Sequence, residues 1–172
     1  MKAKFFLMFV VMFILSMNIV AQVYPEVSIR DIQYQNPDSL LIYFTDDKAP
    51  SLNNDTVVVT GMVMMPPYKA ANPDSGVLMY VGTGSAGFYI QDTAQTDWSG
   101  LLVLLQNASS YPEFGTLDSG TIVKVTGKVF EYSTSTQKTT ELILTDYTGS
   151  EVMDFKQRPQ PVELTLDSLK EI

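Results

Sequence analysis

The residue types needed for most enzyme chemistry are missing from this sequence. Its 172 residues include no histidine and no cysteine, the side chains that most often act as general bases, thiolate nucleophiles and zinc ligands. This excludes catalytic triads built on histidine, cysteine–histidine pairs and histidine-ligated iron or zinc. Four glutamates remain as acid–base candidates: Glu113, Glu131, Glu141 and Glu163. Nothing in their spacing assigns two of them to one cleft, as glycoside hydrolysis requires. We therefore expect no catalytic residues, no enzyme activity and no cofactor.

Two other polar patterns suggest ion binding only weakly. Asp46, Asp47, Asp92 and Asp97 are carboxylates in expected loops, and calcium prefers oxygen ligands of this kind. Their spacing lacks the D-x-D-x-D-G run of a calcium loop, and loop aspartates more often form turns. The glycine-rich residues 82–87 (G-T-G-S-A-G) have neither the lysine of a phosphate-binding loop nor a helix after them. We expect no metal site and a simple hairpin tip, with calcium at the aspartates kept as an alternative.

Aromatic and basic residues provide the candidate binding surface. Its expected members are Tyr80, Tyr89, Trp98, Lys124 and Lys128. Because side chains alternate along a strand, Tyr89 points outward if its neighbour Phe88 points inward, and the two lysines point outward between inward valines. Outward rings can stack on nucleic-acid bases, at about 1–3 kcal/mol per base, and lysines can contact phosphates. The alternative is structural: the tyrosines cover the outer sheet face and Trp98 closes a rim.

A repeated pattern identifies two of the strands that must position these residues. The pattern V-x-V-T-G-x-V occurs at residues 57–63 and again at 123–129. Valines at every second position place their side chains on one face of a strand. A glycine inside a strand often marks a bulge or a tight bend. We expect two bent strands that are neighbours in one closed sheet.

The remaining apolar runs predict an all-β fold. Strands are expected at residues 56–65, 77–81, 87–91, 101–105, 121–132 and 139–145, with a further short strand at 152–155. Residues 27–34 fit either a strand or a short helix. Five principal strands favour a small five-stranded Greek-key barrel, and a two-sheet sandwich is the competing architecture.

The flanking segments suggest export and a larger protein. A basic start, an apolar run at residues 5–15 and the small residue Ala21 are typical of a secretory signal peptide at residues 1–21. The alternative is a membrane anchor, but the run is too short to cross about 30 Å of hydrocarbon. We expect residues 22–52 to be a lead-in that packs on the barrel and 53–157 to be the barrel. Residues 158–172 are expected to be a linker and the start of a following segment, with a short helical start at residues 164–172.

The overall charge limits the choice of partners. The formal charge is −8, and removal of Lys2 and Lys4 with the signal peptide would make it −10. Such an acidic surface repels phosphate backbones at long range, so nucleic-acid binding would need a local basic patch.

Four motifs in a fixed order resemble a known family. They are residues 57–63, G-F-Y-I-Q-D at 87–92, W-S-G-L-L-V at 98–103, and residues 123–129 followed by Glu131 and Tyr132. Together they resemble the OB-fold domains of secreted bacterial proteins, notably those that precede extracellular nuclease domains of the endonuclease/exonuclease/phosphatase type. The resemblance covers about residues 27–169.

The resemblance implies a secreted recognition module and not an activity, because no nuclease domain is present in the sequence. It implies ligand binding on one sheet face and its loops, with single-stranded nucleic acid as the first candidate and saccharide as the second. A further domain of the same protein is another implied partner, and no membrane contact is expected once the signal peptide is removed. The rival interpretation is a structural or adaptor domain of a bacterial surface protein that has no small ligand.

Overall fold

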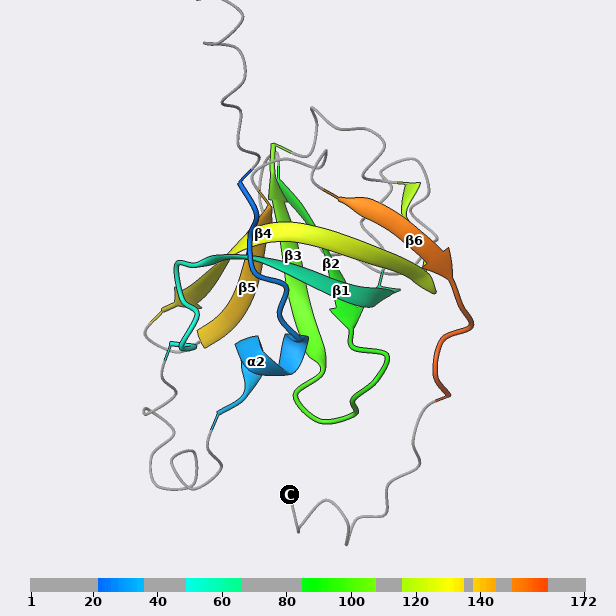
Figure 1. The fold of residues 1–172 in the computed structure, drawn as a ribbon, viewed down its shortest axis with the longest axis horizontal. Coiled ribbons are helices and arrows are strands. Elements are labelled where there is room, and N and C mark those ends of the chain that lie inside the picture. Colours follow the sequence, from blue (N-terminus) through cyan, green and yellow to red (C-terminus); the bar gives the residue numbers. More distant parts are fainter. Residues whose placement is uncertain are drawn as a thin grey trace, which may run out of the picture.

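The computed structural model describes residues 22–35, 49–65, 85–107, 116–134, 138–144 and 150–160. The predictions of a signal peptide at 1–21, a strand at 77–81 and a helical start after residue 160 lie outside these ranges. One short helix and six strands make up the described fold (Figure 1): α2 (Ile29–Gln33), β1 (Thr56–Met65), β2 (Ser85–Gln91), β3 (Gly100–Gln106), β4 (Thr121–Ser133), β5 (Lys138–Leu144) and β6 (Glu151–Phe155). Among the described residues no helix is long and apolar enough to cross a membrane.

The sheet closes into a barrel because β1 pairs with both β2 and β4. The strands follow the order β1-β2-β3-β5-β4, and β4 returns to β1. Every pairing in this ring is antiparallel except that of β3 with β5, which is parallel. Figure 1 shows β1 and β4 crossing in front of β2, β3 and β5. This is the five-stranded Greek-key arrangement of the OB-fold, so the prediction of one closed barrel is confirmed.

The two copies of the repeated pattern pair with each other. Val57 lies opposite Gly127, Val59 opposite Val125 and Gly61 opposite Val123. Each glycine therefore faces the first valine of the other copy, and the middle valines face one another. The repeat is thus a local two-fold arrangement at the seam that closes the barrel.

Each glycine of the repeat lies next to the position at which its strand changes from one pairing strand to the next. Strand β1 pairs with β4 up to Met62 and with β2 from Met62 onward, one residue after Gly61. Strand β4 pairs with β1 up to Lys128 and with β5 from Lys128 onward, one residue after Gly127. A Cβ atom on Gly127 would lie 2.8 Å from Cγ of Leu142 in β5. The missing side chain therefore lets a third strand approach the corner of the barrel.

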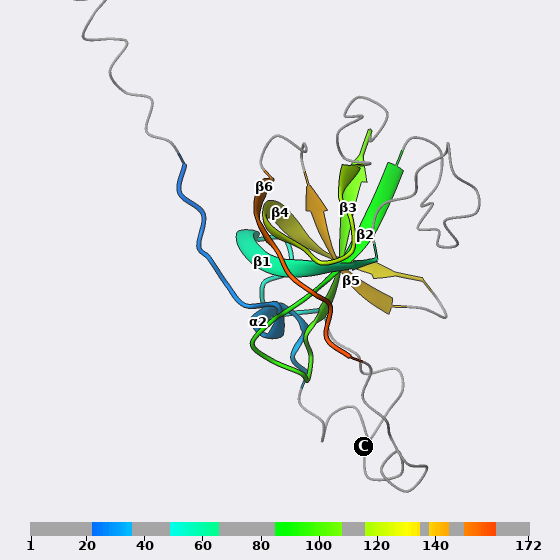
Figure 2. The ribbon, with the colours of Figure 1, turned by 90° about the vertical axis from the view of Figure 1, so that its right-hand side faces the viewer.

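The lead-in segment contributes to the barrel core. Ser28 caps α2 in a capping box with Asp31, and Figure 2 shows α2 at the lower end of the barrel. Ile29 and Ile32, three residues apart on one face of the helix, are fully buried in the same apolar cluster as the strand residues. The ambiguous pattern at residues 27–34 is therefore a helix whose apolar face closes one end of the barrel.

The first half of β1 and the first half of β4 each pair with only one other strand of the barrel, and each has an additional partner from outside it. The amide of Val27 donates to the carbonyl of Val58 (3.0 Å), and the amide of Val58 donates to the carbonyl of Pro25 (2.9 Å). Strand β6 pairs with the first residues of β4 in the corresponding way, which confirms the short strand expected at 152–155. These contacts satisfy backbone groups of β1 and β4 that would otherwise form exposed edges.

Candidate functional site

The outer surface of β2, β3, β5 and the second half of β4 forms one continuous wall. Tyr89, Leu102, Glu141 and Phe130 make a row across these four strands, since each is the direct register partner of the next. The adjacent residues that point into the barrel are fully buried: Phe88, Val103, Leu142 and Val129. The row must therefore face outward. We refer to this surface as the outer wall.

A second row on the outer wall lies beside the first. It runs from Gly87 through Leu104 and Ile143 to Lys128. A Cβ atom on Gly87 would lie 2.8 Å from Cδ2 of Leu104, so the side chain of Leu104 occupies the space beside this glycine. The centre of the outer wall is thus aliphatic and largely buried, with Leu102 5% and Leu104 7% exposed.

Aromatic side chains lie at both sides of this centre. Tyr89 lies on the β2 side. Phe130 and Tyr132 lie on the β4 side, where they are 37% and 46% exposed. These exposed rings give flat, apolar area that planar ligand groups can cover.

A pocket of about 250 Å³ opens at the end of the outer wall next to α2. Its lining includes Tyr89 and Leu102 of the wall, Trp98 from the loop between β2 and β3, and Lys138 at the start of β5. Amide and hydroxyl side chains complete the lining: Gln33, Gln35, Thr139 and Thr140. Two of the predicted binding residues, Tyr89 and Trp98, therefore meet in one pocket. We refer to it as the aromatic pocket.

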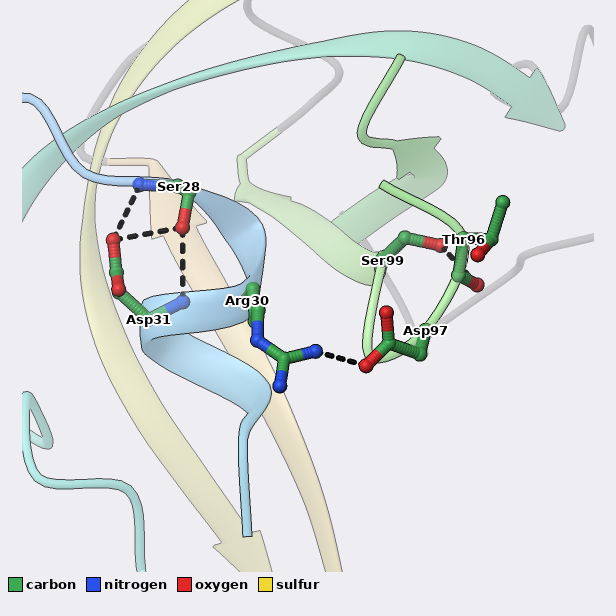
Figure 3. A network of polar contacts seen from close by, with 6 residues as sticks. All are labelled: Ser28, Arg30, Asp31, Thr96, Asp97 and Ser99. Atoms are coloured by element: carbon green, nitrogen blue, oxygen red, sulfur yellow. Dashed lines mark hydrogen bonds and ion pairs between the residues drawn. The ribbon is translucent and has the colours of Figure 1, made fainter. Parts of the chain in front are cut away.

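The loop at residues 92–99 presents Trp98 in a constrained conformation. The amide of Asp92 donates to the carbonyl of Ser99 (2.8 Å), and the hydroxyl of Ser99 donates to the carbonyl of Thr96 (3.2 Å; Figure 3). Trp98 has φ +52°, in the left-handed region that bulky residues rarely adopt. Such a conformation costs about 1–3 kcal/mol and persists only where the surroundings hold it.

Helix α2 and the residue after it supply part of that support. Arg30 forms an ion pair with Asp97 in the loop (Figure 3), and its guanidinium lies 4.9 Å from the ring centre of Tyr34. The ring of Tyr34 meets Trp98 edge to face, with centroids 5.9 Å apart. Gln33 donates to the backbone carbonyl at the start of β3 (2.8 Å). The hydrogen bond from Arg30 lowers the pKa of the Asp97 carboxyl, so this link is intact at neutral pH.

The predicted lysines have different environments. Lys128 is exposed on the outer wall. Lys124 also points outward, but it lies over β1, where its ammonium is 2.7 Å from the carboxylate of Glu26. That hydrogen bond lowers the pKa of Glu26. The structure therefore keeps Lys124 apart from Tyr89 and Trp98, while Tyr80 lies outside the described residues.

Sequence reasoning missed several residues of this surface. Phe130 and Tyr132 continue the outward alternation of Lys124 and Lys128, so extending that alternation by two more positions would have found them. Nothing in the local sequence signals that Lys138 or Tyr34 belongs to the site, because both reach it only through the folding of distant segments.

The acidic residues considered as ion ligands or acid–base groups are described only in part. Among the described residues no three acidic side chains are arranged to hold a metal ion, and Asp46 and Asp47 lie outside those ranges. Of the four candidate glutamates, Glu131 and Glu141 are described. Glu131 accepts a hydrogen bond from the hydroxyl of Thr140 (2.9 Å), whereas Glu141 is buried on the outer wall.

A second pocket, of about 360 Å³, lies among the end of β1, the 92–99 loop and the segment after β6. Its lining includes Met62, Met64, Gln91, Thr96 and Gln157, and no described residue of the lining is aromatic. Because the described lining of this second pocket offers no stacking surface, the aromatic pocket is the better candidate for recognition of planar groups.

Comparison with known proteins supports no family assignment. The sequence matches no model of a protein family, and it matches no curated protein. Among solved structures the fold is similar to a putative aspartyl-tRNA synthetase from Leishmania major Friedlin, with TM-score 0.45 and 10% identity over 88% of this chain. The similarity spans only 27% of the synthetase.

Two smaller proteins are also similar in structure. The N-terminal domain of the PriB protein from Thermoanaerobacter tencongensis has TM-score 0.39 and 19% identity, over 59% of this chain and 99% of that one. A small single-stranded DNA-binding protein from Streptomyces coelicolor has TM-score 0.37 and 17% identity, over 59% and 95%. These values are low, so the assignment of the OB-fold depends on the strand order and closure described above.

Proposed function

We propose that this protein is a secreted, non-catalytic OB-fold module that binds single-stranded nucleic acid on its outer wall. The observation that carries this proposal is the meeting of Tyr89 and Trp98 in the aromatic pocket, with Phe130 and Tyr132 exposed farther along the same wall. Every base has a flat face, and stacking of a base on such a ring contributes about 1–3 kcal/mol. The aromatic positions therefore suit a strand whose bases lie on the wall.

The charges of the wall indicate weak and only moderately salt-dependent binding. Lys128 and Lys138 are the basic residues described on or beside the wall, and the whole chain carries a formal charge of −8. If these two lysines contact two phosphates of a single strand, a plot of the logarithm of the binding constant against the logarithm of the salt concentration should have a slope of about −1.4. Stacking would then supply most of the affinity.

The wider setting of the module rests on the sequence. The apolar leader at residues 1–21 supports export, and the four ordered motifs resemble OB-fold domains of secreted bacterial proteins that accompany nuclease domains. We propose that the module holds a nucleic-acid strand for such a neighbouring domain in a larger protein.

A saccharide is the second candidate ligand, and the lining of the aromatic pocket favours it. Gln33, Gln35, Thr139 and Thr140 offer amides and hydroxyls beside an aromatic ring, and these groups can hydrogen-bond sugar hydroxyls. A neutral saccharide also avoids repulsion by the acidic chain.

Intrinsic fluorescence tests the proposal directly, because Trp98 is the single tryptophan in the sequence. Titration of oligothymidine into the protein at low salt should quench and saturate the Trp98 signal. Tyr89→Ala should weaken binding by about 5- to 150-fold, the equivalent of one lost stacked base. Lys124→Met, on the other side of the barrel, should leave the affinity within about twofold, since it removes only a distant charge.

Each result has a defined meaning. A signal that stays constant up to high micromolar DNA would refute nucleic-acid binding at this pocket. Saturable quenching by a soluble oligosaccharide in place of DNA would establish the second candidate. Quenching by neither ligand would favour the structural or adaptor interpretation.

A further inference from the structure

An acidic side chain occupies the centre of the outer wall. Glu141 lies between Leu102 of β3 and Phe130 of β4 in the first row, and Leu102 also lines the aromatic pocket. Its neighbours along β5, Thr139 and Ile143, face the same side. A carboxylate is thus placed directly beside the rings on which bases would stack.

This carboxylate has an unusual environment for a side chain on an outer face. Although it points outward from the barrel, Glu141 is only 7% exposed. Burial raises the pKa of Glu141, and the charge of Glu131 raises it further. Burial disfavours the ionised form of a carboxyl group, so the fold tolerates a cost of desolvation at this position.

The chemistry of a carboxylate defines the partner it suits. An ionised carboxylate accepts hydrogen bonds and donates none, and its two oxygens can accept from two adjacent N–H groups. On single strands, proteins read bases along their Watson–Crick edges. Guanine presents two adjacent N–H donors there, at N1 and at the exocyclic amine. Thymine presents one N–H between two carbonyl oxygens, which a carboxylate repels.

We propose that Glu141 gives the outer wall a preference for guanine, whose N1–H and exocyclic N–H donate to its two carboxylate oxygens. This inference rests on the proposed function, because it assumes that a base reaches the wall. Stacking alone is tolerant of sequence, so Glu141 would be the residue that adds selectivity. Its negative charge also repels phosphates near the centre of the outer wall. Phosphate contacts would therefore be made by Lys128 and Lys138 at its edges.

A set of three oligonucleotides tests the inference. They are an oligothymidine, the same strand with one central guanine, and the same strand with inosine at that position. Inosine keeps the N1–H of guanine and lacks the exocyclic amine. We expect the guanine strand to bind at least about fivefold more tightly than oligothymidine, with the inosine strand between them, since a bidentate base contact discriminates by about 1–3 kcal/mol.

Two matched variants locate the effect. Glu141→Gln should abolish the preference for guanine, because one carboxylate oxygen becomes an amide donor that faces an N–H group. Glu131→Gln removes the same charge from the neighbouring position on β4 but leaves the carboxylate of Glu141 in place. The preference for guanine should survive in Glu131→Gln, so this variant separates the loss of the Glu141 carboxylate from the loss of one negative charge near it.

The outcomes separate the inference from the proposed function. Equal affinities of the three strands for the unmodified protein would overturn the role of Glu141 while nucleic-acid binding stands, and this result needs no variant to fold. A guanine preference that persists in Glu141→Gln would also overturn it. Binding of none of the strands would refute the proposed function itself.

Discussion

Replacement of Gly127 by alanine tests whether the repeat glycines are needed at the barrel corners. At an ordinary strand position, alanine would stabilise the fold by about 0.5–1 kcal/mol relative to glycine. At Gly127 the added Cβ would meet Cγ of Leu142 at 2.8 Å and the carbonyl oxygen of Ile143 at 2.9 Å. The second neighbour is backbone, so relief of the contact requires movement of β5 away from β4. The two interpretations therefore predict changes of opposite sign.

The expected magnitude follows from these contacts. Overpacking of a well-packed site costs about 1–3 kcal/mol, and the intrinsic gain from alanine offsets about 0.5–1 kcal/mol of it. We expect Gly127→Ala to lower the free energy of unfolding by about 1 kcal/mol, or Tm by about 4 °C. Gly127→Val should lower it further, because valine adds two methyl groups at the same point.

Chemical denaturation with urea, followed by the far-ultraviolet circular dichroism of the sheet, measures the change. Gly100→Ala is the matched control, because an added Cβ there has nothing within 4 Å, and its stability should stay the same or rise slightly. An increase in the stability of Gly127→Ala similar to that of the control would show that the position is ordinary strand and would refute the role given to the corner glycines.

Three further outcomes are expected. Asp97→Asn should weaken the attachment of the loop to Arg30 and shift the emission of Trp98 at neutral pH. The lowered pKa of Asp97 means that the ion pair stabilises the fold above the ordinary carboxyl pKa and is lost as pH falls. The emission of the variant and that of the parent should therefore converge in acid. Glu141→Gln should raise the free energy of unfolding at neutral pH, because the raised pKa of Glu141 means that its ionised form is unfavourable in the folded state. The stability difference between variant and parent should vanish as pH falls below the ordinary carboxyl pKa. Equal stability of the two proteins at neutral pH would contradict this prediction. Tyr34→Ala should red-shift and broaden the emission of Trp98 through loss of the edge-to-face contact, and an unchanged spectrum would show that Tyr34 does not support the ring.

Much of the barrel could be predicted because its signals are local. The valine alternation and the glycine in residues 57–63 and 123–129 depend only on neighbouring positions, and the expected strand at 56–65 matches β1. Strands β2, β3, β4 and β5 were expected within two residues at each end. The segment at 27–34 was ambiguous because Ile29 and Ile32 fit both periods over so short a stretch, and the helix depends on the cap formed by Ser28.

The site was harder to predict because its contacts join distant segments. Arg30 and Asp97 are 67 positions apart, and Lys124 meets Glu26 across 98 positions. No local pattern indicates which charge a lysine will face, so Lys124 was assigned to the binding surface although Glu26 engages it elsewhere. The burial of Glu141 is equally absent from the local pattern, because alternation predicts that the side chain points outward and does not predict how exposed it is.

Mapping of amide chemical shifts by nuclear magnetic resonance during titration with single-stranded DNA tests the central claim most directly. We expect the largest shifts at Tyr89, Trp98 and Leu102 and along β5 and the second half of β4, with β1 and the Lys124 region unchanged. Absence of shifts, or shifts confined to the β1 side of the barrel, would contradict binding at the outer wall.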